Sequence, residues 1–250
     1  MHKEEYQHMH DVEADHFWFR AKAQFLKIAM TRCRIPLRAR ILDVGCGTGQ
    51  TLKNLHTWGY AHAQGIDTSI DAAQWCRTDG LRTQEYQGDA LPFPPESFDL
   101  IICLDVLEHV SHDHALVSEF ARVLAPDGAC IAMVPAHPRL WSYHDEAMGH
   151  YRRYTRTQMR ALFQQAGLHT SATSPLHTAL FLPFLIFRAL KSHLSSHPQS
   201  DTTSLRFLAP LNALLFPLLY LPELIWFRLF GKLPFGNSLL LIARKEKRPQ

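Results

Sequence analysis

The ten residues from Ile41 to Gln50 constrain the fold of this chain more than any other segment. They read ILDVGCGTGQ, so an apolar run leads into Gly45, Gly47 and Gly49. Glycine permits a tight turn with positive φ and lets a ligand approach the backbone without an obstructing Cβ. A strand-to-helix loop at the carboxyl edge of a parallel sheet is where open α/β proteins bind ligands. We therefore predict a parallel α/β sheet with a ligand site at this loop.

The spacing of the glycines separates this loop from those that bind dinucleotides. Dinucleotide loops follow G-x-G-x-x-G and place a pyrophosphate at the N-terminus of the next helix. Here the pattern is Asp-x-Gly-x-Gly-x-Gly, followed by Gln50. Asp43 would repel a pyrophosphate, but it could hold a cationic ligand through an ammonium group. The loop thus favours a pyrophosphate-free nucleoside and argues against a nicotinamide-dependent oxidoreductase.

Short apolar runs alternate with amphipathic stretches from Arg40 to about Val134, which is typical of βαβ units. We predict strands at 40–44, 63–66, 84–87, 98–104 and 129–134, then at 168–174 and 238–243. Helices are expected after the glycine loop through His56, from 70 to the stop at Gly80, and over 114–124. Thr155 and Gln158 form a capping box that opens a further helix.

These elements divide the chain into four zones. Residues 1–39 are an N-terminal helical cap, and 40–174 are a Rossmann-like core. Residues 175–237 are an apolar helical insertion, and 238–250 are a final strand with a basic tail. The apolar run Phe207–Pro222 contains three prolines and is shorter than the roughly 20 residues that span a membrane. We expect short helices that lie on a membrane, form a lipid-like substrate pocket, pack on another subunit or are buried on the domain.

Charge and cysteine usage limit the cellular setting. The formal net charge of +3 does not suggest a protein that coats nucleic acid. Five scattered cysteines without a CxxC pair fit buried thiols in a reducing compartment. Because residues 1–20 lack an apolar signal-peptide core, we expect a cytoplasmic protein. The apolar insertion would place it peripherally on the inner face of the membrane, and the oligomeric state stays open.

Two acids follow the next strands in order. Asp67 ends the second strand about 20 residues past the loop, where an acid can accept both hydroxyls of a ribose. Asp89, in Gly-Asp-Ala after the third strand, can accept a hydrogen bond from an adenine amine, and Ala90 offers a backbone N–H. Each alone is weak evidence, because aspartate at a strand end is often a helix cap or turn former. Together they indicate an adenosine-like ligand.

The segments ILDVGCGTG, GID, QGDA and FDLIICLDVLEHV together resemble the class I S-adenosylmethionine-dependent methyltransferases. The resemblance covers Arg40 to Val134. It implies a Rossmann-like sheet of seven strands, the last antiparallel and supplied by Ser238–Ala243. Residues 105–110 are similar to the O-methyltransferases of quinone biosynthesis. The chain differs from those enzymes by its long apolar insertion before the last strand. HFWFR at 16–20 and the block 141–155 resemble a bacterial subgroup whose substrates are largely unassigned.

The resemblance also implies which residues bind S-adenosylmethionine. Asp43 and the three glycines would line its amino-acid part, Asp67 its ribose, and Asp89, Ala90 and Leu104 its adenine and methionine chain. Cys46 and Thr68 lie beside these positions and are included in the site. Arg20 would meet the cofactor carboxylate as part of a lid with Trp18, although packing of the N-terminal cap explains both residues equally well.

Methyl transfer depends largely on alignment of the acceptor, but a hydroxyl acceptor benefits from a base. His109, after the fourth strand, and His144, after the fifth, are the candidate bases, and Asp145 is a candidate orienting partner. Any one of the sixteen histidines can equally be structural.

We expect His150, Arg152, Arg153 and Tyr154 to bind substrate, the arginines being suited to an anionic group. A solvated basic face is the alternative. We predict no metal, although Glu108 and His109 could join a metal site. The function expected is methylation of a small-molecule or lipid-linked acceptor, with oxygen as the methylated atom. The alternative is a non-catalytic, membrane-associated binding protein with the same fold.

Overall fold

The computed structural model of the chain describes residues 10, 13–87, 90–183, 185–186 and 212–247. Its helices in chain order are α2 (Phe17–Arg32), α3 (Gln50–Thr57), α4 (Ile70–Thr78), α5 (Asp113–Val123), α6 (Tyr143–Ala147), α7 (Arg156–Gln165) and α10 (Asn212–Phe230). The short 3-10 turns are η1 (Leu107–His109) and η2 (Pro138–Leu140). The strands are β1 (Ile41–Val44), β2 (Ala63–Asp67), β3 (Thr83–Glu85), β4 (Phe98–Leu104), β5 (Leu124–Pro135), β6 (Leu168–Leu176) and β7 (Ser238–Lys245).

The seven strands form one sheet in the order β3-β2-β1-β4-β5-β7-β6. Pairing is parallel from β3 to β5, and β7 is antiparallel to both β5 and β6. The predicted seven-stranded Rossmann-like sheet with an antiparallel last strand is therefore confirmed. β5 begins earlier than expected, because Leu124 already pairs with Phe98. Residues 126–128 lie within this strand, where Asp127 has a φ of 65°.

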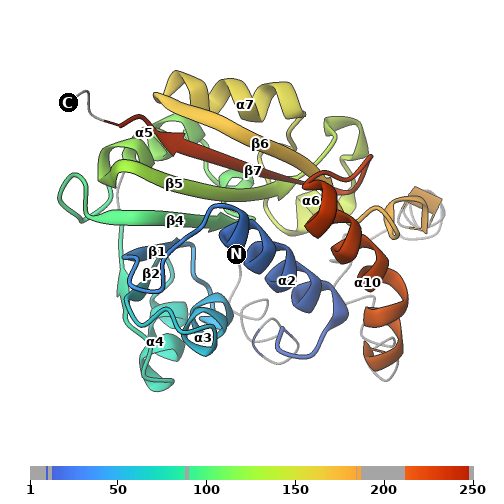
Figure 1. Cartoon of the computed structure of the whole chain (residues 1–250), viewed down its shortest axis with the longest axis horizontal. Coiled ribbons are helices and arrows are strands. Elements are labelled where there is room, and N and C mark those ends of the chain that lie inside the picture. Colours follow the sequence, from blue (N-terminus) through green and yellow to red (C-terminus); the bar gives the residue numbers. More distant parts are fainter. Residues whose placement is uncertain (1–9, 11–12, 88–89, 184, 187–211, 248–250) are drawn as a thin grey trace.

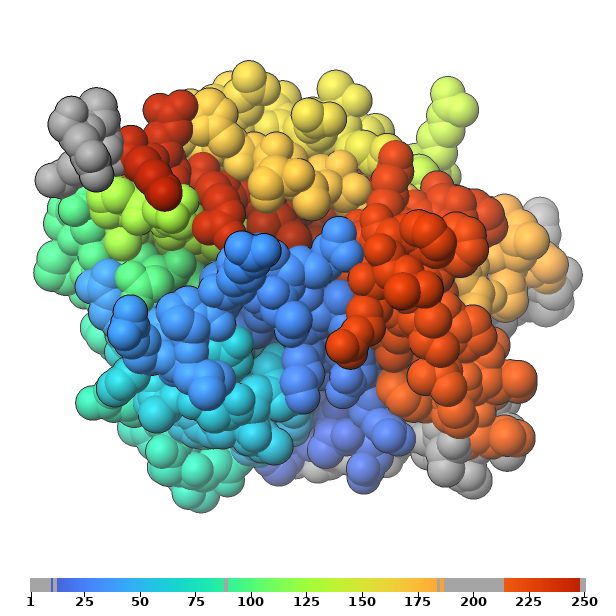
Figure 2. All heavy atoms as spheres, in the orientation of Figure 1, coloured from blue at the N-terminus to red at the C-terminus, as the bar shows by residue number. Residues whose placement is uncertain are grey.

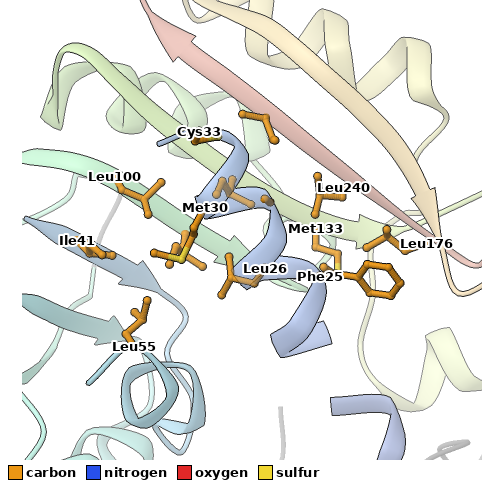
Figure 3. Close-up of a cluster of buried hydrophobic side chains, with 14 of the residues drawn as sticks. Phe25, Leu26, Met30, Cys33, Ile41, Leu55, Leu100, Met133, Leu176 and Leu240 are labelled. Carbon is orange, nitrogen blue, oxygen red and sulfur yellow. The ribbon is translucent and has the colours of Figure 1, made fainter. Parts of the chain in front are cut away.

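Helices cover both faces of the sheet (Figure 1). Successive residues of β1 point to opposite faces, so Ile41 and Leu42 belong to two different hydrophobic clusters. On one face α2 packs Phe25, Leu26 and Met30 against the sheet (Figure 3). On the other face α5 and α7 supply the packing. The sheet is thus apolar on both sides, as expected for parallel strands between helical layers.

The described part of the insertion contains helical residues at 181–183 and 185–186 and the long helix α10. α10 runs for 19 residues and includes Pro217 and Pro222. It packs along α2, where the ring centroid of Phe25 lies 5.4 Å from that of Phe227 and 6.4 Å from that of Tyr220. An interior proline removes one helical hydrogen bond and favours a kink, so the packing of α10 on α2 must offset this cost. Among the described residues, no helix combines the length and hydropathy needed to cross a membrane.

Candidate functional site

Four strands, β1, β2, β4 and β6, end at the same edge of the sheet. The glycine loop follows β1, Asp67 ends β2, Asp105 follows β4 and His177 follows β6. β6 points the same way as β5 because both are antiparallel to β7. The carboxyl edge of the sheet therefore gathers these groups, as predicted for a ligand site in an open α/β fold.

The glycine loop turns tightly against the next strand. Its three glycines have φ values of 70°, 53° and 87°, in the left-handed region. A Cβ on Gly45 would lie 2.3 Å from Cγ2 of Val106, closer than real Cβ atoms approach. The amides of Gly45 and Cys46 both donate to the carbonyl of Ile66, at 2.8 and 3.0 Å. Position 45 therefore accepts only glycine without a shift of its neighbours.

Asp67 joins the glycine loop to the helix that follows β2. Its Oδ2 accepts the amide of Gly47 and its Oδ1 the amide of Ser69, each at 2.9 Å. The Ser69 hydroxyl in turn accepts the amide of Ala72 and caps α4. A carboxylate offers about four acceptor positions in total. Asp67 thus holds the glycine loop and the start of α4 in place without a ligand.

Asp43 is a buried acid in the middle of β1, and only 2% of it is exposed. Its Oδ2 has no hydrogen-bond partner among the residues that the structure describes. Burial and the nearby negative charge of Asp67 raise the pKa of Asp43 well above its usual range. A buried acceptor without a hydrogen-bond partner lowers the stability of a folded protein, and a cationic donor would supply the missing hydrogen bond. The residues therefore fit a ligand that carries an ammonium group.

Two charged residues from the N-terminal segment reach this edge and were not predicted. The Thr48 hydroxyl donates to Glu13, and the Lys22 ammonium, from α2, donates to Asp105. Burial raises the pKa of Glu13. Burial would also raise the pKa of Asp105, but the charge and hydrogen bond of Lys22 hold it below its usual range. Both partners lie far away in the chain, so no local pattern could have indicated them.

Arg20 lines a cavity of about 360 Å³ between α2, α3 and α10. The cavity mixes polar groups such as Gln50 and Asn54 with apolar ones such as Leu221. The guanidinium of Arg20 lies 4.5 Å from the ring centroid of Phe216 in α10. Because Gln50 opens the helix after the glycine loop, the cavity adjoins that loop.

A histidine pair lies near the end of β4. The ring centroids of His109 and His150 are 4.7 Å apart, and that of His144 is 6.0 Å from His150. Burial and the charge of His150 lower the pKa of His109 to about 4. His109 is consequently neutral at pH 7 and able to accept a proton.

Asp145 contacts His150. Its Oδ1 lies 2.9 Å from Nδ1 of His150 and 2.7 Å from Nε of Arg153, and the carboxylate is fully buried. Its Oδ2 accepts the amide of Ser142 and so caps α6. Burial would raise the pKa of Asp145, but the hydrogen bond with His150 and the charge of Arg153 bring it below the usual range. Asp145 was expected to orient a candidate base, and the histidine that it contacts is His150.

The other predicted substrate-binding residues contact protein groups. Arg153 is buried and also donates to the carbonyl of Ala136. Arg152 pairs with Asp113 at 2.9 Å, and the Tyr154 hydroxyl donates to the same carboxylate at 2.8 Å. These contacts fasten residues 152–154 to the first residue of α5 and to the end of β5, whereas the ring of His150 lies beside those of the candidate bases.

One group of side chains could hold a metal. Glu108, His109 and His150 offer ligand atoms that all lie within 4.8 Å of one another. Glu108 is 1% exposed, its Oε2 has no partner among the described residues, and burial raises its pKa well above the usual range. The absence of a metal stays a prediction.

The remaining predicted cofactor residues are placed as follows. Asp89 lies outside the described residues. Ala90 and Thr68 are exposed, and Leu104 is partly buried at the end of β4. Cys46 is buried and packs close to Gly65, where a Cβ would lie 2.7 Å from its Sγ. Of the four that the structure describes, no side chain makes a contact that by itself identifies a ligand.

His177 was missed by sequence reasoning although it is fully buried at the carboxyl edge. Its Nδ1 lies 3.0 Å from the Tyr220 hydroxyl, and its ring stacks on Trp18 with centroids 3.8 Å apart. Burial and the positive charge of Lys22 lower its pKa to about 3. The residue follows an apolar strand end without any motif, so nothing local distinguished it from the other fifteen histidines.

Comparisons with known proteins agree with the sequence resemblance. A family model described as a methyltransferase domain matches residues 10–172. The demethylmenaquinone methyltransferase of Tropheryma whipplei (strain Twist) is 34% identical over 130 residues, which are 50% of this chain and 51% of that protein. The ubiquinone biosynthesis O-methyltransferase of Xylella fastidiosa (strain 9a5c) is 38% identical over 104 residues, 38% and 42% of the two chains. The chain thus spans about half the length of these relatives, or less.

Among solved structures, an S-adenosylmethionine-dependent methyltransferase from Mesorhizobium loti superposes with a TM-score of 0.57. The two share 17% identity, and the match covers 87% of this chain and 96% of that one. At this identity the likeness establishes the fold.

Proposed function

The chain belongs to the methyltransferase domain family, and on that basis we propose that it transfers a methyl group from S-adenosylmethionine to a small-molecule or lipid-linked acceptor. The methylated atom is proposed to be an oxygen. One observation carries the cofactor assignment. The buried Oδ2 of Asp43, beside the glycine loop, has no hydrogen-bond partner among the described residues and could accept from a cationic donor. The non-catalytic alternative gains no specific support from the site.

The cofactor would be held by residues of the carboxyl edge. Asp43 would accept from its ammonium group, and the glycine loop would leave room for its amino-acid part. Asp67, already fixed by two amides, would bind the ribose. Arg20, in the adjoining cavity, would meet the carboxylate. Asp89 and Ala90 remain the proposed adenine contacts.

When bound, S-adenosylmethionine supplies a methyl group on a sulfonium, whose leaving group is neutral. The protein's part is to align the acceptor and to remove its proton. His109 is the base that we propose, because its lowered pKa keeps it neutral at pH 7. His150, held by Asp145, packs edge-on against it. His144, whose ring lies beyond His150, is the second candidate.

The acceptor is proposed to be amphipathic. The cavity beside the glycine loop offers apolar side chains from α10 together with polar groups from α3. Such a lining suits a small polar head joined to an apolar chain. We accordingly propose a cytoplasmic protein that works peripherally at the inner face of a membrane.

Calorimetry with S-adenosylhomocysteine tests the cofactor site. We expect Asp43→Asn to weaken binding about ten- to hundred-fold, since a hydrogen bond to a charged group contributes roughly 1.5–3 kcal/mol. Asp127→Asn, an exposed acid in β5, is the matched control and should bind like the wild type. Failure of the wild-type protein to bind, or unchanged binding by Asp43→Asn, would refute the assignment.

A further inference from the structure

One face of α10 is apolar and exposed. Its side chains recur every three or four residues and are 49–68% exposed at Leu214, Leu218, Leu221, Ile225 and Leu229. Trp226 and Phe230 extend this strip at 51% and 61%. We call these seven residues the outer α10 face. Figure 2 shows α10, in orange to red, on the surface of the molecule beside the blue α2.

The opposite side of α10 is fixed to the domain. Tyr220 and Phe227 are buried against Phe25 of α2. Glu223 is also buried, and its carboxylate accepts the amides of Thr178 and Ala179. The helix therefore presents the outer face in a set orientation.

The charges described at the C-terminal end of this face are positive. In the sequence, residues 175–237 contain five Lys or Arg and two acids, Asp201 and Glu223, and Glu223 is buried. Arg228 and Lys232 are exposed at the C-terminal end of α10. The exposed Arg32, at the end of α2, joins them there and donates to the Arg228 carbonyl at 3.2 Å. Three cations thus gather beside the apolar strip.

We propose that the outer α10 face binds the surface of an anionic lipid bilayer. An apolar helix face buried at the headgroup boundary, with basic residues beside it, is the arrangement of interfacial helices. Contiguous exposed apolar patches mark interaction sites on soluble proteins. A second copy of the chain is a poorer occupant. The same cations lie beside its own outer α10 face and would repel these, and its Glu223 is buried and cannot pair with them.

The surface also adjoins the proposed reaction site. Leu221 belongs to the outer α10 face and lines the cavity that contains Arg20. In this respect the inference rests on the proposed function, since a docked membrane would deliver a lipid-linked acceptor to that cavity. Binding to the bilayer itself needs no catalysis and can be measured separately.

The test is flotation of the full chain with vesicles of phosphatidylcholine alone and with added phosphatidylglycerol. We expect the wild type to float with the anionic vesicles. Leu218→Glu/Leu229→Glu, which avoids the cavity lining, should weaken binding at least about ten-fold, because two exposed leucines that would enter the bilayer are lost. Arg228→Glu/Lys232→Glu should weaken it roughly five-fold or more per charge and reduce its salt dependence. Leu37→Glu, a 60% exposed leucine outside the face, is the control and should bind normally.

Wild-type protein that stays unbound at low salt overturns the proposal, as does equal loss in the Leu37→Glu control. A wild-type dimer that the leucine pair converts to a monomer, with no vesicle binding, assigns the face to a second copy instead. Calorimetry with S-adenosylhomocysteine on the same variants separates the two proposals. Normal cofactor binding without flotation rejects the docking surface alone, and flotation without cofactor binding rejects the proposed function alone.

Discussion

At the scale of single residues, one carboxylate connects the glycine loop to the next element. Asp67 accepts amides from Gly47 and from Ser69, so it has a structural role in addition to the ribose contact proposed for it. A residue that holds a loop and binds a ligand should report both effects when it is replaced.

Asp67→Ala should lower the free energy of unfolding by roughly 1–3 kcal/mol, because two amides lose their acceptor. Asp67→Asn retains one acceptor oxygen and should cost less, while both variants weaken S-adenosylhomocysteine binding. Urea unfolding and calorimetry measure the two effects. If Asp67→Ala unfolded like the wild type, the amide contacts would not stabilise the loop.

The pH dependence of the rate tests the proposed base. With a pKa of about 4, His109 is already deprotonated well below pH 6.5. The profile of kcat should therefore be free of an acid limb near pH 6.5 and should fall only below about pH 5. His109→Gln should lower kcat by roughly 10²- to 10⁴-fold. His114→Gln, an exposed neighbour, should leave kcat unchanged, and an equal effect in both variants would remove His109 from the reaction.

The glycine loop after β1 could be predicted because its residues stand in consecutive positions, and its binding of a cofactor stays a prediction. Asp43 and the glycines needed no knowledge of distant contacts. Lys22 and His177 could not be found in this way, since Lys22 meets Asp105 83 residues away and His177 meets Tyr220 43 residues away. Such pairs exist only after the helices have packed on the sheet.

At the scale of elements, α10 shows how packing can override a local signal. Pro217 and Pro222 predict interruption, yet the helix is continuous. Its inner side contributes Tyr220 and Phe227 to the cluster around Phe25. The strands were easier to predict, because apolar runs between glycine and proline turns mark them locally.

The importance of that packing can be measured with a matched pair of phenylalanines in α10. Phe227 is 1% exposed and Phe230 is 61% exposed. Phe227→Ala should reduce the free energy of unfolding by about 3–5 kcal/mol, because it leaves a cavity against α2. Phe230→Ala should change it by less than about 0.5 kcal/mol. Equal effects in denaturant unfolding would mean that α10 is not held by its buried side.

At the scale of the whole molecule, buried histidines couple stability to pH. The pKa of His177 falls from an ordinary 6.5 to about 3 on folding. Between these values the unfolded chain binds more protons, so the contribution of His177 is present above pH 6.5 and is lost as the pH falls. Buried acids with raised pKa values, such as Asp43, act in the opposite direction.

A comparison of variants isolates this effect. The stability advantage of the wild type over His177→Gln should shrink by up to about 1.4 kcal/mol per pH unit between pH 6.5 and 4. The buried acids are common to both proteins and cancel in the difference. Urea unfolding at several pH values gives the slope, and a constant difference would mean that His177 titrates normally in the folded protein.

The position of β7 bears on how the chain reaches its fold during synthesis. Within the sheet β6 pairs only with β7, although the ribosome makes β6 some sixty residues earlier. Until residues 238–245 have emerged, β6 has no strand beside it and β5 keeps an open edge. The half of the sheet from β3 to β5 can form first, whereas β6 must wait until residues 238–245 have been made. The nascent chain therefore carries an unpaired strand while the apolar residues 177–237 are made, and an unpaired strand edge favours aggregation.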